Sequence, residues 1–341
     1  MMNKILSIAK ISSLLFRDIT SISDGSGIIA EFENAFKNYI GTKYALATNN
    51  GTSALHSAYF SLGLKADDQV ILPSYTWHST LAPLFPIKVK PVFSEIDPDT
   101  LTLDPYDVEK RINNKTKAII LVHLWGNVCD LKRFLKLKRE YGLSLVQDCS
   151  HCIGAKYQGI MVGSLGDVSC FSLQGSKAVS AGEGGVLITN TKTIYKKALS
   201  FGRPEMNNLK NKNLSYDLGF GYKYRPHPFA MVLALNNLKF IDVRIKKELD
   251  KLGYLNNKII NSRYVKNISK YDNVELGSIY GYRGILRNNV SFNLALNRLK
   301  KEGLKIKKEF YPLLHKASMF NNKIKLPITE KIYKKIVSFS I

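Results

Sequence analysis

Cysteine is scarce in this sequence, with four residues among 341. Cys149 and Cys152 have the C-x-x-C spacing that is found in redox and zinc sites. A zinc site would need a second such pair or a pair of histidines, and neither stands at a suitable spacing. We therefore expect no metal site, and we interpret the cysteines as reduced, structural residues.

Long apolar runs are also missing. No stretch reaches the roughly 18 apolar residues that a membrane-spanning helix needs. Residues 5–16 are largely apolar, but Lys10 interrupts them and no small-residue cleavage site follows. The sequence therefore predicts no membrane span, and we expect a cytoplasmic protein.

Acidic residues are too few to balance the basic ones, since 27 Asp and Glu stand against 50 Lys and Arg, a net charge of +23. Such a surplus can attract nucleic acid. The basic residues are scattered, however, and many fall on predicted helix faces such as 132–139 and 246–258. Neither a dense terminal tail nor an aromatic RNA-binding motif is present. We expect no nucleic-acid partner, whereas a small anionic substrate would benefit from the positive field.

What the chain does contain is a regular alternation of strand and helix patterns. Ile29, Phe32, Phe36 and Tyr39 form a helical stripe that Gly41 ends. Further helices are predicted near 52–62, 104–112 and 131–141, and strands at 44–48, 69–72, 89–93, 118–123, 143–147, 168–171 and 185–189. This alternation predicts a three-layer α/β fold, a mostly parallel sheet with helices on both faces.

One lysine, Lys177, has unusual surroundings. It follows a short apolar strand, Ser172 stands five positions before it, and the glycine-rich turn 182–185 follows it. An amine on a tight loop at a strand end, near hydroxyls and free backbone N–H groups, suits a Schiff base with a phosphorylated aldehyde. Pyridoxal phosphate (PLP) is the obvious aldehyde, and an ordinary exposed loop lysine is the alternative.

Asp148 directly follows another predicted strand, and His151 lies three residues further on. Ligands of open α/β sheets bind at the carboxyl ends of strands. A carboxylate at that place can pair with the pyridine nitrogen of PLP and keep it protonated. A turn could bring His151 over the cofactor ring or its 3-hydroxyl. A helix cap for Asp148 and a structural role for His151 are the alternatives.

Gly51, Thr52 and Ser53 follow the first predicted strand and begin a predicted helix. The unpaired N–H groups and the positive dipole end of a helix start favour an anion, and the two hydroxyls add donors. An ordinary N-cap is the alternative. The segment is not a Walker loop, because G-x-x-x-x-G-K-[ST] is absent.

Taken together, these segments resemble the PLP-dependent sugar-nucleotide aminotransferases of the DegT type, which have the aspartate aminotransferase fold (fold type I). Five motifs occur in the family's order: GTSAL (51–55), PSYTW (73–77), DCSHCIGA (148–155), FSLQGSK (171–177) and GEGG (182–185). The resemblance runs from about residue 25 to about residue 326. Motifs in this order are a much stronger signal than any one of them alone.

The resemblance implies a role for each matching residue. Lys177 would bind PLP covalently and carry the proton between substrate and cofactor carbons, and Asp148 would hold the pyridine nitrogen. Trp77 would stack on the ring, and His151 would support the ring and its hydroxyl. Phosphate binding would involve Gly51, Thr52, Ser53 and Ser172.

The chain departs from the family pattern in two places. The family's G-x-N-x-R motif supplies an asparagine that reaches the phosphate across a homodimer interface, and here residues 221–225 place Lys223 at that position. The C-terminal part is short compared with the family. We expect a PLP-binding large domain at 1–240 and a small, shortened α+β domain at 241–341.

The activity that the resemblance implies is transfer of an amino group from an amino acid, with glutamate expected, to a nucleotide-linked keto sugar in polysaccharide or glycan precursor biosynthesis. One alternative is a cyclitol (inosose) aminotransferase, since residues 174–177 also resemble that branch. Lys177 argues against a PLP sugar dehydratase, because such relatives typically have histidine there. A catalytically weak PLP-binding regulatory protein is the remaining alternative.

Overall fold

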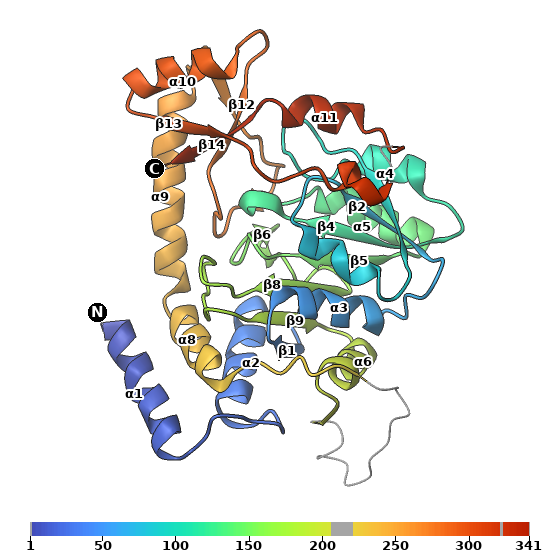
Figure 1. Cartoon of the computed structure of the whole chain (residues 1–341), viewed down its shortest axis with the longest axis vertical. Helices are drawn as coiled ribbons and strands as arrows, with labels where there is room; N and C mark the ends of the chain where they lie inside the picture. Colours follow the sequence, from blue (N-terminus) through green and yellow to red (C-terminus); the bar gives the residue numbers. More distant parts are fainter. Residues whose placement is uncertain (1, 206–220, 321–322, 341) are drawn as a thin grey trace.

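A seven-stranded sheet forms the centre of the computed structural model, which describes residues 2–205, 221–320 and 323–340 (Figure 1). In spatial order its strands are β1 (Tyr44–Thr48), β9 (Gly185–Thr189), β8 (Val168–Ser172), β5 (Ser144–Asp148), β4 (Thr116–Val122), β2 (Gln69–Pro73) and β3 (Lys90–Ser94). Only β9 runs against its neighbours in this sheet, being antiparallel to β1 and β8. Each of the seven predicted strands lies in this sheet, which confirms the mostly parallel α/β fold.

Helices cover both faces of the sheet. Along β4, Ile119 and Leu121 enter one apolar core, whereas Ile120 and Val122 enter the other. The first core receives side chains of α2 (Gly27–Ile40), α4 (Pro105–Arg111), α5 (Leu131–Tyr141) and α8 (Pro228–Leu238), and the second those of α3 (Gly51–Ser61) and α6 (Lys192–Gly202). Strands buried on both faces have few polar side chains, which explains their continuous apolar sequence.

The predicted stripe on α2 faces the first core. Ile29, Phe32 and Phe36 are fully buried, and Tyr39 packs at the edge of the same core. Gly41 follows the helix with φ 79°, a left-handed conformation that glycine adopts without strain. The N-terminal helix α1 (Met2–Phe16) packs against α8, where the Asn236 amide donates a hydrogen bond to the Ser7 hydroxyl (2.8 Å).

The C-terminal part of the chain forms a separate antiparallel sheet. Its strands, in spatial order, are β10 (Val265–Asn267), β12 (Arg283–Leu286), β14 (Ile336–Ser340) and β13 (Lys305–Lys308). The helices here are α9 (Ile241–Ile259), α10 (Phe292–Lys301) and α11 (Pro327–Tyr333). Helix α9 ends at Ile259, and Val265 a few residues later pairs with Leu286 in the sheet. The domain boundary at 240 and the shortening of the second domain stay predictions.

A small third sheet joins the two regions. It pairs β11 (Val274–Glu275) with β6 (Lys156–Tyr157), which also pairs with β7 (Ile160–Met161). Short 3₁₀ turns occur at 78–80, 82–84, 124–126, 314–316 and 318–320. Because β6 lies shortly after Asp148, this pairing brings residues 277–283 toward the ends of the central strands. Among the described residues, no helix combines the length and the apolar character that crossing a membrane requires.

Candidate active site

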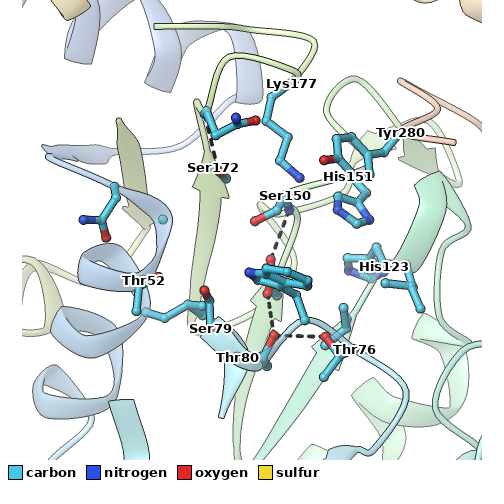
Figure 2. A pocket seen from close by; sticks show the side chains of 18 of the residues that line it. Thr52, Thr76, Ser79, Thr80, His123, Ser150, His151, Ser172, Lys177 and Tyr280 are labelled. Atoms are coloured by element: carbon cyan, nitrogen blue, oxygen red, sulfur yellow. Dashed lines mark hydrogen bonds between the residues drawn. The ribbon is translucent and has the colours of Figure 1, made fainter. Parts of the chain in front are cut away.

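A cavity of about 420 Å³ opens at the carboxyl ends of the central strands, and the predicted residues Lys177 and Asp148 both line it. Figure 2 shows Lys177 extending from its loop toward His151 and Tyr280. The lysine follows β8, and the residue is 9% exposed. Burial lowers the pKa of Lys177 to about 8, against a smaller opposing effect of the Asp148 charge. A lysine with a lowered pKa is a better nucleophile near neutral pH.

Asp148 is the last residue of β5, and its carboxylate is buried at the cavity wall. One oxygen, Oδ2, accepts a hydrogen bond from the Thr80 hydroxyl (3.0 Å), and Oδ1 accepts one from the Ser150 N–H (3.1 Å). These two donors fix the plane of the carboxylate and leave lone pairs free toward the cavity. The carboxylate can therefore accept a further hydrogen bond, such as one from a protonated pyridine nitrogen.

His151 is buried in a stack of aromatic rings. Its ring lies 4.1 Å from that of Tyr280 at 17° and 5.4 Å from that of Trp125 at 25°. The backbone N–H of Trp125 donates to His151 Nδ1 (3.1 Å), so the ring proton of the neutral histidine is on Nε2. Burial, together with the charges of Lys177 and Arg283, holds the pKa of His151 well below its usual value. His151 is thus a neutral donor through Nε2.

The start of α3, where the sequence predicts an anion site, lies at the cavity. Thr52 and Ser172 line the cavity, and a Cβ on Gly51 would lie 3.0 Å from the Cβ of Ser172, so glycine permits this close approach. Ser53 does not line the cavity, and its N–H donates to the Asn50 side chain (2.8 Å) as an N-cap contact. Phosphate binding by Gly51, Thr52, Ser53 and Ser172 stays a prediction.

Trp77 and Lys223 occupy different positions relative to the cavity. Trp77 is 45% exposed at the cavity wall, with its ring 5.1 Å from that of Tyr311. Lys223 is exposed and lies outside this cavity, on a segment whose Tyr222 N–H donates to the Phe201 carbonyl (2.6 Å). The structure brings Trp77 to this cavity of its own chain, and it does not bring Lys223 there.

Several cavity residues were not predicted from the sequence. They are Thr76, Ser79, Thr80, Ser150, Gln174, Glu183, Tyr280, Phe310 and Tyr311. Thr80 and Ser150 could have been found from their closeness to Trp77 and Asp148 in the sequence. Tyr280 and Tyr311 carry no local signal, because they reach the site only through the folding of the C-terminal region.

His123, Cys149 and Cys152 form a buried cluster whose candidate ligand atoms lie within 4.8 Å of one another. Both ring nitrogens of His123 already have partners, since Nε2 lies 2.9 Å from the Gln147 side-chain oxygen and Nδ1 accepts the Cys129 N–H (3.1 Å). Burial lowers the pKa of His123 to about 4, against the opposing effects of Gln147 and Asp148. Metal binding would cost His123 one of these hydrogen bonds, so the cluster is better explained as packing.

Comparison with known proteins identifies the family. The sequence profile of the DegT/DnrJ/EryC1/StrS aminotransferase family matches residues 20–341. The GDP-perosamine synthase of Escherichia coli O157:H7 is 32% identical over 322 residues, covering 92% of this chain and 85% of the relative. A putative L-glutamine:3-amino-2,3-dideoxy-scyllo-inosose aminotransferase of Micromonospora echinospora is 29% identical over 304 residues, covering 85% of this chain and 71% of that relative.

A solved structure of DesI, determined in the presence of its TDP-sugar product, superposes with a TM-score of 0.83 at 26% identity and covers 99% of this chain and 85% of DesI. These findings confirm the resemblance that the five motifs indicated, the fold and the expectation of an enzyme. The chain belongs to the DegT/DnrJ/EryC1/StrS aminotransferase family, and its cofactor is PLP.

Proposed function

We propose that this enzyme transfers an amino group from an amino acid, with glutamate the expected donor, to a nucleotide-linked keto sugar in polysaccharide or glycan precursor biosynthesis. The observation that carries the proposal is that Lys177 and Asp148 line one cavity at the carboxyl ends of the central strands. The matches to a GDP-perosamine synthase and to DesI with its TDP-sugar product support a nucleotide-linked substrate.

Each of the side chains around the cavity would have a separate role in this reaction. PLP, when bound, supplies a reactive carbonyl and an electron sink. Lys177 would act as the nucleophile and then as the proton carrier, and Asp148 would hold the proton on the pyridine nitrogen. His151 would donate from Nε2 to the ring hydroxyl, and Trp77 would stack on the ring. The phosphate would bind at the start of α3 through Gly51, Thr52 and Ser172, with Ser53 beside them.

A free cyclitol is the second candidate substrate, because the Micromonospora echinospora relative is named for an inosose. The +23 net charge favours the nucleotide-linked sugar, since a diphosphate is a strong anion and an inosose is neutral. A sugar dehydratase is disfavoured by the amine of Lys177, as the sequence indicated. A weak PLP binder would bind the cofactor without converting it.

We expect the PLP-loaded enzyme to consume glutamate and to aminate nucleotide-linked keto sugars, with free keto sugars and free inososes at least about 100-fold poorer in kcat/KM. Binding energy from the remote nucleotide can position the keto carbon, so the loss should appear in kcat as well as in KM. The measurement is a mass-spectrometric screen of both substrate panels.

Borohydride reduction followed by peptide mapping is the control for this screen, and it should fix PLP on Lys177. A label on another lysine would refute the site. Comparable kcat/KM for a free inosose would favour the cyclitol candidate, and cofactor binding without conversion by any amino acid would favour the regulatory one.

We also propose a two-fold homodimer in which Lys223 reaches the phosphate of the neighbouring site. Its exposed position outside the cavity of its own chain supports this, as does the match of residues 221–225 to a cross-subunit motif. Lys223→Ala should weaken PLP binding about tenfold, because one phosphate charge loses its partner, and sedimentation should give a dimer. An active monomer, or unchanged PLP affinity in the variant, would contradict the proposal.

The cytoplasmic location is part of the same proposal. The four cysteines are free and buried, as is usual for proteins of a reducing compartment. Recovery of the enzyme in a periplasmic or membrane fraction would rule it out.

A further inference from the structure

Tyr280 contacts the amine of Lys177 directly. The Lys177 Nζ lies 3.5 Å from the centre of the Tyr280 ring, well within the distance at which an ammonium group is attracted to an aromatic face. Within the part of the chain that the structure describes, no carboxylate forms an ion pair with Lys177. The ring face is therefore the closest electrostatic partner of this buried amine.

The position of the Tyr280 ring is set from several sides. Its hydroxyl lies 3.0 Å from the hydroxyl of Ser176, the residue before Lys177. Its face stacks on His151, as described above. The preceding backbone is also fixed, because the Ser278 N–H donates to the Ile153 carbonyl (2.8 Å) and the Ile279 N–H donates to the Glu248 carboxylate (2.8 Å). A ring held at this many points has little freedom to leave the lysine.

An aromatic face suits a lysine that must be released and used again. An ammonium group loses solvation on burial, which favours the neutral amine. A carboxylate partner would stabilise the ammonium form and so keep the lysine protonated. A ring face attracts the ammonium form less strongly and offers no fixed acceptor, so the amine can lose its proton and move. This agrees with the pKa of Lys177, which burial lowers to about 8 while Asp148 acts in the opposite direction.

We propose that Tyr280 is a further catalytic residue, whose ring face holds the Lys177 amine whenever that amine is not covalently engaged and keeps it within reach for proton transfer. The inference rests on the proposed function, since it requires Lys177 to be released during each turnover. The ring face, rather than the hydroxyl, is the part of Tyr280 that contacts the amine.

Two substitutions separate the ring from the hydroxyl. Tyr280→Phe keeps the face, and Tyr280→Leu removes it at similar bulk. Tyr282→Leu is the matched control, because Tyr282 lies on the same segment but outside the cavity, with its hydroxyl bonded to the Glu248 carbonyl. Each variant is first freed of cofactor. Acetylation of Lys177 by acetic anhydride is then followed by peptide mass spectrometry from about pH 6 to about pH 10, a range that extends from neutral pH toward the ordinary pKa of a lysine amine.

We expect Tyr280→Leu to raise the acetylation rate of Lys177 at neutral pH about three- to fivefold, because the neutral amine gains population and access. Tyr280→Phe and Tyr282→Leu should stay within about twofold of the unchanged protein. In the PLP-loaded enzymes, Tyr280→Leu should lower kcat about tenfold or more with the donor KM within about threefold, as expected when an interaction of the chemical step is lost.

Unchanged or slower acetylation in Tyr280→Leu would overturn the inference, and so would equal losses in the Phe and Leu variants. Borohydride mapping distinguishes this outcome from failure of the proposed function. If PLP is fixed on a residue other than Lys177 in the unchanged protein, the proposed function fails. If it is fixed on Lys177 throughout and Tyr280→Leu turns over normally, only the role of Tyr280 fails.

Discussion

Replacing Asp148 by asparagine is expected to leave PLP bound and to lower the kcat of transamination by about 10²–10³-fold, the size of effect seen when a single electrostatic partner of a reacting group is lost. The amide keeps the shape of the side chain but removes the charge that, in the proposed function, holds the pyridine nitrogen protonated, so the electron sink would weaken.

The fold should tolerate this change. In the native protein, Asp148 Oδ1 accepts the Ser150 N–H and Oδ2 accepts the Thr80 hydroxyl. The amide oxygen can keep the contact with Ser150, and the amide nitrogen can donate to Thr80, whose hydroxyl rotates to accept. A loss of activity in Asp148→Asn would therefore report the missing charge rather than a collapsed site.

Thr80→Val is the matched control, because it removes a hydrogen bond to Asp148 but leaves the carboxylate in place. We expect a loss of about fivefold or less in that variant, the cost of one hydrogen bond. Single-turnover measurements with glutamate separate the chemical step from product release. A near-normal rate for Asp148→Asn, or equal losses in the two variants, would show that the carboxylate does not act at the pyridine.

The parts of the site that follow from the sequence are those that lie at strand ends. Asp148 is the last residue of one buried, apolar strand and Thr52 comes shortly after another, and parallel strands bring their carboxyl ends to one edge. Lys177 could be predicted because it follows an apolar strand and a serine and is followed by a glycine-rich turn. Local pattern and topology together therefore predict this half of the cavity.

The other half of the cavity depends on contacts between distant segments. Tyr280 reaches the site because β11 pairs with β6, and these strands lie more than 100 residues apart in the sequence. A two-residue strand has no periodicity that could predict such a pairing. Trp125 has a left-handed backbone, φ 61°, which local propensity would not assign to a tryptophan. Tertiary contacts set these positions.

The second large effect is expected on the free energy of unfolding, when a buried ion pair beside the cavity is broken. Arg283 and Glu309 have side chains that are 6% and 1% exposed, and Arg283 Nε donates to Glu309 Oε2 (2.6 Å). The Tyr75 hydroxyl donates to the same oxygen (2.8 Å), and the guanidinium lies 3.5 Å from the centre of the Trp125 ring. The pair thus joins the C-terminal region to the aromatic stack of the cavity.

Arg283→Met should lower the free energy of unfolding at pH 7 by about 3–5 kcal/mol, because it leaves a buried carboxylate without its cation. Glu309 normally has a lowered pKa. Burial alone would raise it, but the Arg283 charge and the hydrogen bonds outweigh burial. That stabilisation is complete above the ordinary pKa of a glutamate and is lost as the pH falls through the lowered value.

The variant should show the opposite dependence on pH. Without Arg283, burial raises the pKa of Glu309, so protonation stabilises the variant as the pH falls toward 4, where an ordinary glutamate titrates. The stability difference from the native protein should therefore be largest at pH 7 and shrink toward pH 4. Urea unfolding at both pH values measures it, and Arg287→Met, at an exposed arginine on the same segment, is the control, with an expected cost below about 1 kcal/mol. A difference that is the same at both pH values would mean that Arg283 stabilises the fold through packing on Trp125 and not through the charge of Glu309.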